Sequence, residues 1–385
     1  MKNPLLFIYL LMLSTANLIA QPTPLQINWK VAGELPAPDG QSHSLGVAGP
    51  LTGVHHNVLL VAGGANFPGG MPWLGGQKKY YKEGFVFRKD EHDSVISMTT
   101  FLLPQTLAYA ACCSTPQGVV IAGGENESGL QNAVLLLQWN EARQSVLIKG
   151  LPALPFAVTN ASLVYHQHKI YLAGGERQQD VSSELLVLDL TDTASGWQKL
   201  SVMLKPVSHA ILVVQSNSKD NCLYLLGGRK RNNGRVSDLY ASVYQYSLKK
   251  GTWTEKQSLP YALSAGTGNA IGTHSILLFG GDRGETFHKT ENLIIAIAGE
   301  KDSLKKAQLT EEKSKVQSSH PGFSRQILLY DTKKDQWVLD GHLPFSTPAT
   351  TTAVMWNGDF FLPSGEIKAG VRTPQILMGK LNISK

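Results

Sequence analysis

Short apolar runs of strand length alternate with glycine-rich turns along most of the chain. Five of the runs end in a pair of glycines and a sixth ends in Ser-Gly, with the last residue of each at Gly64, Gly124, Gly175, Gly228, Gly281 and Gly365. A Leu-Pro phrase precedes several of these runs, and most units carry one tryptophan after the glycine pair. Glycine allows a tight backbone turn and close packing where a strand ends. The pattern predicts six similar units built from short strands.

The period resembles the kelch repeat, whose unit is a four-stranded blade of a β-propeller roughly 50 residues long. We therefore expect an all-β fold, a six-bladed kelch-type β-propeller, as a single domain over residues 21–385. After the last Ser-Gly, "TPQILMGKLNISK" supplies a third strand but no fourth, while the N-terminal "LQINWKVAGELP" repeats the Trp-then-Leu-Pro phrase. We expect this N-terminal strand to join the C-terminal blade and close the ring, which leaves no exposed edge.

Two units are longer than the rest, and both gain residues directly after the glycine pair. The first contains "ANFPGGMPWLGGQKKYYKEG", and the fifth runs from Asp282 to about Phe323. The fifth includes a charged stretch of good helix formers, which predicts a surface helical insertion at about 286–322. Both insertions leave from second-strand ends, so they are expected on one face of the propeller. Long loops on one face of a rigid scaffold usually form a site or its lid.

The first 20 residues have the layout of a secretory signal peptide: Lys2, an apolar run from Leu5 to Leu13, then small and polar residues to Ala20. We expect an exported protein, periplasmic in a bacterium or otherwise secreted. No cysteine stands directly after the expected cleavage point, so a lipid anchor is not expected, and no other stretch is long enough to span a bilayer. No membrane anchor is therefore expected.

Composition and charge narrow the classes of function. The 385 residues are 42% hydrophobic and 17% charged, which is typical of globular proteins. The net charge of +6 is not gathered into an aromatic-interleaved basic patch, so nucleic-acid binding is not expected. Cys112, Cys113 and Cys222 lie in apolar runs and are interpreted as buried small residues. The histidines at 166 and 168 precede a strand at a turn, so we expect no metal site and no cofactor; the oligomeric state stays open.

The position after each glycine pair is a candidate site position. In a closed ring these positions point to one end of the central channel, and five of them are polar: Glu125, Glu176, Arg229, Asp282 and Glu366. For Glu125, Glu176 and Asp282, a polar residue in a turn exposed to water is an equally good interpretation as a residue of a site. Asn66, in the first unit, and Arg229 are candidate hydrogen-bonding partners for a substrate. Tyr109 is a further candidate that could reach the channel, although packing is the alternative.

The segment "SGEIKAGVRTP", which contains Glu366 and Arg372, resembles a motif of the N-acetylneuraminate epimerases, the sialic acid mutarotases. Their motif has the form Gly-Glu-Ala/Ile-Lys-x-Gly-x-Arg-Thr. The glycine-rich loop "LLVAGGANFPGG" and the charged insertion after Gly281 resemble the same family, so the resemblance covers essentially the whole mature chain. In the better-known members the Glu-Arg loop lies mid-chain, so this chain resembles a cyclically permuted mutarotase branch. A ring of blades tolerates such a change.

The resemblance implies an isomerase that interconverts the α and β anomers of a small sugar acid, N-acetylneuraminate. One group removes the proton of the anomeric hydroxyl and another delivers a proton to the ring oxygen. Glu366 is the expected base, and Arg372 is expected to hold the carboxylate of the sugar or to stabilise developing negative charge. The alternative is a non-catalytic exported propeller that binds glycans or a protein. A copper-radical oxidase is disfavoured because its Cys–Tyr pair has no counterpart among buried-looking cysteines.

Overall fold

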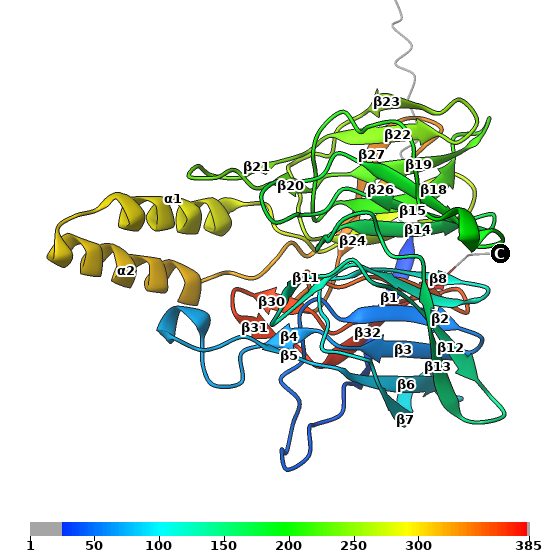
Figure 1. The fold of residues 1–385 in the computed structure, drawn as a ribbon, viewed down its shortest axis with the longest axis horizontal. Helices are drawn as coiled ribbons and strands as arrows, with labels where there is room; N and C mark the ends of the chain where they lie inside the picture. The colour runs from blue at the N-terminus through cyan, green and yellow to red at the C-terminus, as the bar shows by residue number, and fades with distance from the viewer. Residues whose placement is uncertain (1–24, 383–385) are drawn as a thin grey trace, which may run out of the picture.

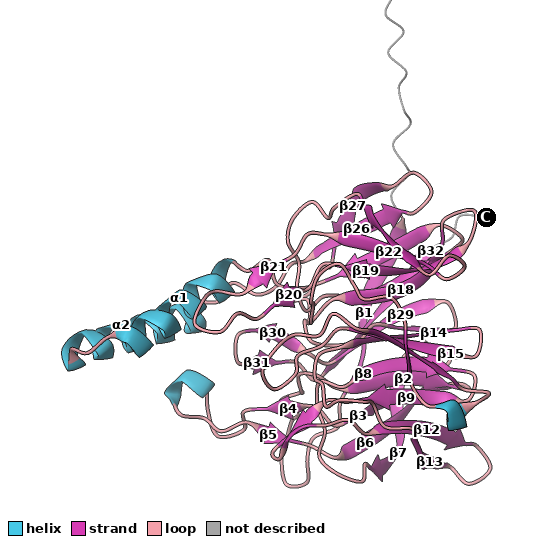
Figure 2. Ribbon diagram, turned by 45° about the horizontal axis from the view of Figure 1, so that its top comes forward, coloured by secondary structure: helices cyan, strands magenta, loops and turns pink. Residues whose placement is uncertain are grey.

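Six four-stranded antiparallel sheets surround a common axis in the computed structural model, which describes residues 25–382 (Figures 1 and 2). The sheets follow one another along the chain, and the innermost strands of successive sheets are neighbours around the axis. The fold is therefore a six-bladed β-propeller, as the repeat predicted. The expected signal peptide, residues 1–20, lies outside the described residues.

Each blade runs from an innermost to an outermost strand. The first three blades are β2 (Leu51–His55), β3 (Val58–Ala62), β6 (Glu83–Lys89) and β7 (Val95–Leu102); β8 (Ala111–Thr115), β9 (Gly118–Ala122), β12 (Val134–Asn140) and β13 (Ser145–Leu151); and β14 (Ser162–His166), β15 (Lys169–Ala173), β16 (Leu185–Asp189) and β17 (Gln198–Lys199). The last three are β18 (Ile211–Ser216), β19 (Asn221–Leu226), β22 (Val243–Ser247) and β23 (Thr252–Lys256); β24 (Thr267–Ile271), β25 (Ser275–Phe279), β26 (Gln326–Asp331) and β27 (Gln336–His342); and β28 (Val354–Trp356), β29 (Asp359–Pro363), β32 (Gln375–Asn382) and β1 (Gln26–Glu34).

The N-terminal strand closes the ring, which confirms the prediction. β1 pairs antiparallel with β32 and so becomes the outermost strand of the C-terminal blade, with Trp29 opposite Gly379. A Cβ at position 379 would come within 2.8 Å of the Trp29 ring, so glycine makes room for the indole. The same indole meets Phe279 edge-on, with ring centroids 5.3 Å apart. The two ends of the propeller chain are thus joined by a paired strand and aromatic packing.

The second strand of each blade explains why the chain shows continuous apolar runs. All five residues of β3, β9 and β29 are buried. A strand covered on both faces needs apolar side chains at every position rather than at alternate ones. Here the covering layers are the neighbouring blades. The outermost strands, such as β7, are largely exposed and show no such run.

A closed ring of backbone hydrogen bonds surrounds the axis at the start of the inner strands. One residue per blade adopts a left-handed backbone, with φ between 51° and 62°: Gly49, Tyr109, Asn160, His209, Ala265 and Thr350. Each of these N–H groups donates to the carbonyl of the equivalent residue in the preceding blade, at 2.7 to 3.0 Å. We call these six residues the axial ring. Its six bonds tie every blade to both neighbours at one level of the channel.

The glycine pairs sit where adjacent blades come closest. Gly63 has a φ of 60°, and a Cβ there would lie 2.2 Å from the Leu107 carbonyl oxygen of the next blade. In the sixth unit Ser364 takes the first place of the pair and keeps a left-handed φ of 55°. Its buried hydroxyl accepts the Val47 N–H at 2.9 Å and donates to the Thr373 carbonyl at 2.7 Å. These hydrogen bonds offset the strain that a non-glycine residue carries there.

Four short hairpins and the long insertions project from one face, seen on the left in Figure 1. The hairpins are β4 (Ala65–Asn66) with β5 (Lys79–Tyr80), β10 (Glu125–Asn126) with β11 (Gly129–Leu130), β20 (Arg229–Lys230) with β21 (Asp238–Leu239), and β30 (Glu366–Lys368) with β31 (Val371–Arg372). Two 3-10 turns complete the elements, η1 (Pro72–Leu74) in the first insertion and η2 (Thr193–Ser195) in the third blade.

The insertion in the fifth blade contains two helices, where the sequence predicted one. Helix α1 (Glu285–Gly299) and helix α2 (Ser303–Ser318) lie side by side. Asp302 caps the start of α2, where its side chain accepts the Leu304 and Lys305 N–H groups. Glu291 on α1 accepts hydrogen bonds from both the N–H and the hydroxyl of Ser237 in the neighbouring blade. Helix α2 contacts η1 of the first insertion. The two insertions therefore meet above the same face.

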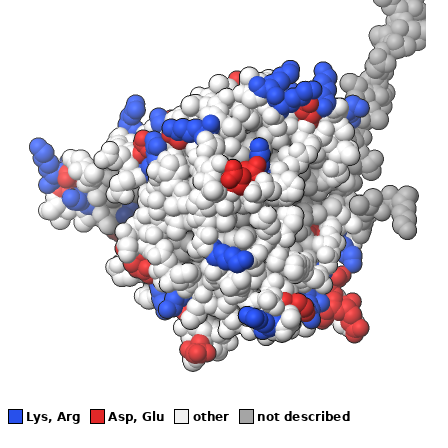
Figure 3. Space-filling view, turned by 45° about the vertical axis from the view of Figure 1, so that its right-hand side comes forward, with Lys and Arg blue, Asp and Glu red and all other residues white. Residues whose placement is uncertain are grey.

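Charge is spread thinly over the side of the molecule shown in Figure 3, where small groups of either sign are separated by uncharged surface. Such a surface offers no extended basic track for nucleic-acid phosphates. Within residues 25–382, no helix is long and apolar enough to cross a bilayer.

Candidate active site

A cavity of about 380 Å³ opens at the end of the central channel, on the face that carries the hairpins. Its floor includes Tyr109, Asn160, His209 and Thr350 of the axial ring, and residues that follow the glycine pairs form its walls. The α1–α2 hairpin and the segment after α2 contribute Phe287, Gln317, His320 and Phe323. Charged groups from several blades therefore converge under a partly apolar roof.

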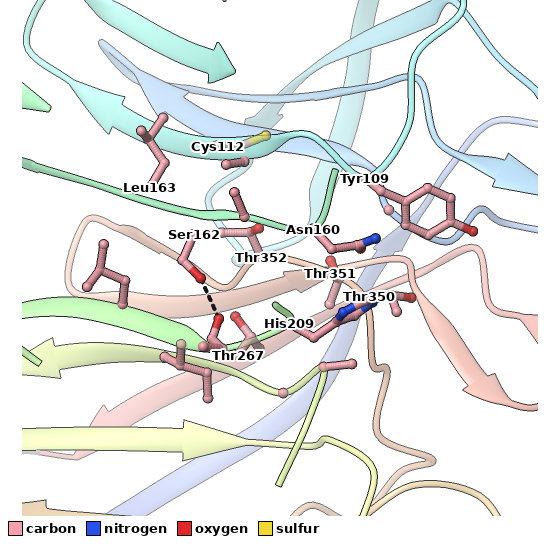
Figure 4. A pocket seen from close by; sticks show the side chains of 18 of the residues that line it. Tyr109, Cys112, Asn160, Ser162, Leu163, His209, Thr267, Thr350, Thr351 and Thr352 are labelled. Carbon is pink, nitrogen blue, oxygen red and sulfur yellow. Dashed lines mark hydrogen bonds between the residues drawn. The ribbon is translucent and has the colours of Figure 1, made fainter. Parts of the chain in front are cut away.

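A smaller space of about 120 Å³ continues along the axis between the inner strands. Figure 4 shows the axial-ring side chains at one end of this space and small side chains such as Ser162 and Thr352 further along it. The Ser162 hydroxyl already donates to the Ala210 carbonyl at 2.6 Å. The charged groups gather in the larger cavity, so that cavity is the candidate site.

Glu366 presents a carboxylate to the cavity from the start of β30. Its backbone N–H and carbonyl are both bonded to Ala349, at 3.0 and 2.7 Å, which ties the residue to its neighbouring segment. Its Oε1 accepts the Gly370 N–H at 2.9 Å and lies 3.4 Å from Nη1 of Arg372. The side chain is 20% exposed. One oxygen is thus fixed by the hairpin, while the carboxylate as a whole reaches the cavity.

Arg372 lies behind Glu366 and is only 5% exposed. It is directly opposite Glu366 in the β30–β31 pair, which explains the spacing of the two residues in sequence. Its guanidinium stacks on the Phe67 ring at 4.7 Å, and its Nε and Nη1 have no hydrogen-bond partner in the described part of the chain. Arg372 does not line the cavity. Its position suits a group that orients Glu366.

Tyr109 belongs to the axial ring, and its phenol lies near Glu366 and Arg372. Burial raises the pKa of Tyr109 to about 12, and the neighbouring Arg372 partly opposes that rise. The phenol is therefore neutral at ordinary pH and can donate a hydrogen bond into the cavity that it lines.

The structure brings Glu176 and Arg229 together on another wall, with Glu176 Oε1 3.4 Å from Arg229 Nη2. Glu176 also accepts the Ser208 hydroxyl at 3.1 Å and lies 3.7 Å from Arg231. Arg229 lines the cavity, and its guanidinium stacks on Phe287 of α1 at 4.7 Å. This pair therefore presents its cation, rather than its carboxylate, to the cavity.

His209 of the axial ring lies against the same pair. Its Nδ1 is 3.5 Å from Glu176 and its Nε2 is 3.3 Å from Arg229 Nη2. Burial, together with the positive charge of Arg229, lowers the pKa of His209 well below its ordinary value. The imidazole is neutral, so Arg229 remains the cation of this wall.

Glu125 and Asp282 complete the polar walls. Glu125 accepts hydrogen bonds from the Tyr80 hydroxyl at 2.7 Å and from Lys78 at 3.2 Å, both of which come from the first insertion. Asp282 accepts the Gly284 N–H at 2.8 Å, at the point where the chain enters α1. Both carboxylates line the cavity, but each already has a protein partner.

Asn66, like Arg372 and Glu176, does not line the cavity. Its amide group donates to the Gly46 carbonyl and accepts the Tyr81 hydroxyl, both at 2.8 Å. The buried side chain lines a separate outer hollow of about 540 Å³. Asn66 joins the first insertion to the segment before β2, and its proposed contact with substrate has no geometric support.

Several cavity residues were missed in the sequence. Asn160 and His209 occupy the same repeat position as Tyr109, so aligning the phrases before each inner strand would have found them. Lys78, Phe287 and His320 belong to the insertions, which have no repeat to align. Among residues 25–382, no group of three or more histidine, cysteine or acidic side chains is placed to hold a metal ion.

Comparisons with known proteins identify the family of the chain. The sequence profile of the N-acetylneuraminate epimerase family matches residues 14–146 and 151–385. Proteins named N-acetylneuraminate epimerase from Yersinia enterocolitica and Salmonella typhi are 29% identical over 199 residues and 28% identical over 191 residues, with 50% and 49% of this chain covered. A third, from Brucella melitensis, is 24% identical over 234 residues, or 60% of this chain. The chain spans about half the length of the first two relatives, 49% and 48% respectively.

Proposed function

Because the chain belongs to the N-acetylneuraminate epimerase family, we propose that it accelerates interconversion of the α and β anomers of N-acetylneuraminate. The observation that carries the proposal is the Glu366 carboxylate, which reaches a cavity that Arg229 also lines. A cavity of about 380 Å³ lies within the usual range for small-molecule sites. The carboxylate suits proton removal from a sugar hydroxyl, and the guanidinium suits recognition of a sugar carboxylate.

Glu366 is the proposed base. It takes the proton of the anomeric hydroxyl while the bond between the anomeric carbon and the ring oxygen breaks, and it passes this proton to the ring oxygen, so that a ketone and a free hydroxyl form. Rotation about the neighbouring carbon–carbon bond and reclosure on the other face give the second anomer. Reclosure uses the same proton movements in reverse, so Glu366 is a carboxylate at the end of each cycle.

We assign the contact with the sugar carboxylate to Arg229. Guanidinium binds carboxylates through paired hydrogen bonds, and Arg229 lines the cavity. Arg372 has the same chemistry but is almost fully buried behind Glu366. Arg372 is therefore proposed to hold Glu366 in position.

The proposal also includes the cellular location of the protein and the type of its repeat. The first 20 residues support export, to the periplasm in a bacterium, and the glycine-pair period supports assignment of the blades to the kelch type. The position of the Glu366 loop near the C-terminus supports a cyclic permutation relative to the better-known members.

Proton NMR of freshly dissolved β-N-acetylneuraminate tests the function, because the H3 resonances distinguish the two anomers. The wild-type protein should speed the approach to equilibrium, and Glu366→Gln should lower the catalysed rate by about 10² to 10⁴, as expected for loss of an acid–base group. Glu311→Gln is the matched control, since Glu311 is exposed on α2 and forms an ion pair with Lys315.

Different outcomes would contradict different parts of the proposal. A near-normal rate in Glu366→Gln would remove Glu366 as the base but keep the activity. Failure of the wild-type protein to accelerate equilibration would exclude this substrate, and binding of the sugar without turnover would favour a non-catalytic propeller.

A further inference from the structure

Most polar groups that face the cavity already have protein partners. Lys78 and Glu125 bond to each other at 3.2 Å, and Asp282 accepts the Gly284 N–H. Both ring nitrogens of His209 lie against neighbours, Ser208 at 3.1 Å and Arg229 at 3.3 Å. One further imidazole, His320, enters from the segment that follows α2 and has a different environment.

The ring of His320 is held in place by its own turn. The turn His320-Pro321-Gly322 has a left-handed Gly322 with a φ of 97°, and the Gly322 N–H donates to Nδ1 of His320 at 3.0 Å. The Phe323 ring lies against the imidazole, with centroids 5.0 Å apart. Within residues 25–382, no protein group is hydrogen-bonded to Nε2, although the residue lines the cavity.

This contact fixes the form of the imidazole. A nitrogen that accepts an N–H must keep its lone pair, so the neutral ring carries its proton on Nε2. Burial lowers the pKa of His320, while Asp282 and Glu366 oppose the shift and Lys368 adds to it. The Gly322 contact and the burial of the ring thus both favour a neutral imidazole whose Nε2–H is free to donate.

We propose that His320 donates this Nε2–H hydrogen bond to the ring oxygen of the sugar while Glu366 moves the proton. The inference rests on the proposed anomerase function. When the ring opens, the electrons of the broken carbon–oxygen bond go to the ring oxygen, and that oxygen takes the proton that Glu366 removed from the anomeric hydroxyl. His320 keeps its own proton throughout. It stabilises the negative charge that develops on the oxygen before the proton arrives.

The helical insertion then supplies a group that acts in catalysis, in addition to covering the cavity. His320 follows directly from α2, while α1 is anchored to the neighbouring blade through Glu291 and Ser237. The base comes from one blade and the hydrogen-bond donor from the insertion of the blade before it. The site is complete only when the insertion is in place.

The test compares kcat and KM for wild type, His320→Ala and His320→Gln by NMR exchange between the anomers. His320→Ala should lower kcat by about 10² to 10³, the usual effect of losing one such donor, with KM nearly unchanged. His320→Gln should recover most of this loss, because its amide also donates, and should keep the wild-type pH profile. His92→Gln is the control, since His92 is 79% exposed on an outer loop.

Each other outcome overturns the inference. Wild-type kcat in His320→Ala would show that the donor is not needed. Equal losses in both variants, with a limb of the pH profile removed, would make His320 a proton-transferring group. Nitrogen-15 NMR of the free protein that places the proton on Nδ1 would contradict the assigned tautomer, even if a variant fails to fold. An inactive wild-type protein would instead remove the proposed function, and the inference with it.

Discussion

Two glutamate–arginine pairs each present one member to the cavity, with the same closest separation and opposite arrangements. Glu366 and Arg372 approach to 3.4 Å, and so do Glu176 and Arg229. In the first pair the arginine is 5% exposed and the carboxylate reaches the cavity. In the second the carboxylate is surrounded by protein groups and the arginine lines the cavity. One ion pair therefore offers a base, and the other offers a cation.

The difference arises from what covers each pair. Arg372 comes from the same hairpin as Glu366 and is covered by Phe67 from the first insertion. Arg229 comes from the blade after Glu176, and its outer face meets Phe287 of the helical insertion. The distance between a glutamate and an arginine therefore does not decide which of the two faces a ligand. The insertions decide which partner meets the ligand.

Removal of the buried arginine should have the largest effect among the changes that test this comparison. In Arg372→Met, Glu366 loses the partner opposite it, and a displacement of about 1 Å at a reacting group can cost about 10² in rate. We expect kcat to fall by about this factor, with KM within a few-fold of wild type. Arg283→Met is the control, because Arg283 stacks on Tyr261 outside the cavity. A raised KM with unchanged kcat would instead make Arg372 a substrate anchor.

Removal of the exposed arginine should act on binding rather than on the chemical step. Hydrogen bonds to charged groups contribute about 1.5–3 kcal/mol, so Arg229→Met should raise KM by roughly 10-fold to 10²-fold and leave kcat within a few-fold. The wild-type protein should bind the methyl ester of the sugar, which lacks the negative charge, more weakly than it binds the acid. The variant should bind the acid and the ester with similar affinity. Equal discrimination in both proteins would place the carboxylate elsewhere.

Neutralisation of the enclosed carboxylate should have the smallest effect. Glu176→Gln removes a negative charge that competes with substrate for Arg229, so KM should fall by at most a few-fold while kcat stays at the wild-type value. Saturation curves for wild type and variant, measured together, would show this change. A loss of kcat comparable to that of Glu366→Gln would identify Glu176 as the base and reverse the comparison.

The sequence predicted the propeller well because its signals are repeated. Each second strand shows the same apolar run and turn, and the N-terminal Trp29 phrase identified the closing strand that pairs with β32. The second helix of the insertion was not predicted. The break between α1 and α2 depends on a local cap at Asp302, which has no counterpart in other units.

The site was predicted less completely than the fold. Positions after the glycine pairs identified Glu125, Arg229, Asp282 and Glu366 as groups around one opening, and the structure places all four on the cavity. Which partner of a pair faces inward depends on aromatic residues from distant insertions, such as Phe67 and Phe287. His320 gave no sequence signal, because its geometry depends on a three-residue turn.

The axial ring separates the shape of the cavity floor from its chemistry. Its six hydrogen bonds use only main-chain atoms, and the residues that make them include glycine, alanine, tyrosine, asparagine, histidine and threonine. No side chain takes part in these hydrogen bonds, so five of the six positions accept different side chains, whereas a Cβ at Gly49 would lie 2.4 Å from the Tyr109 ring. A substitution at Asn160 or Thr350 would change what a ligand touches while the frame stays still. Evolution or design can thus change the selectivity of this scaffold through one axial-ring side chain at a time.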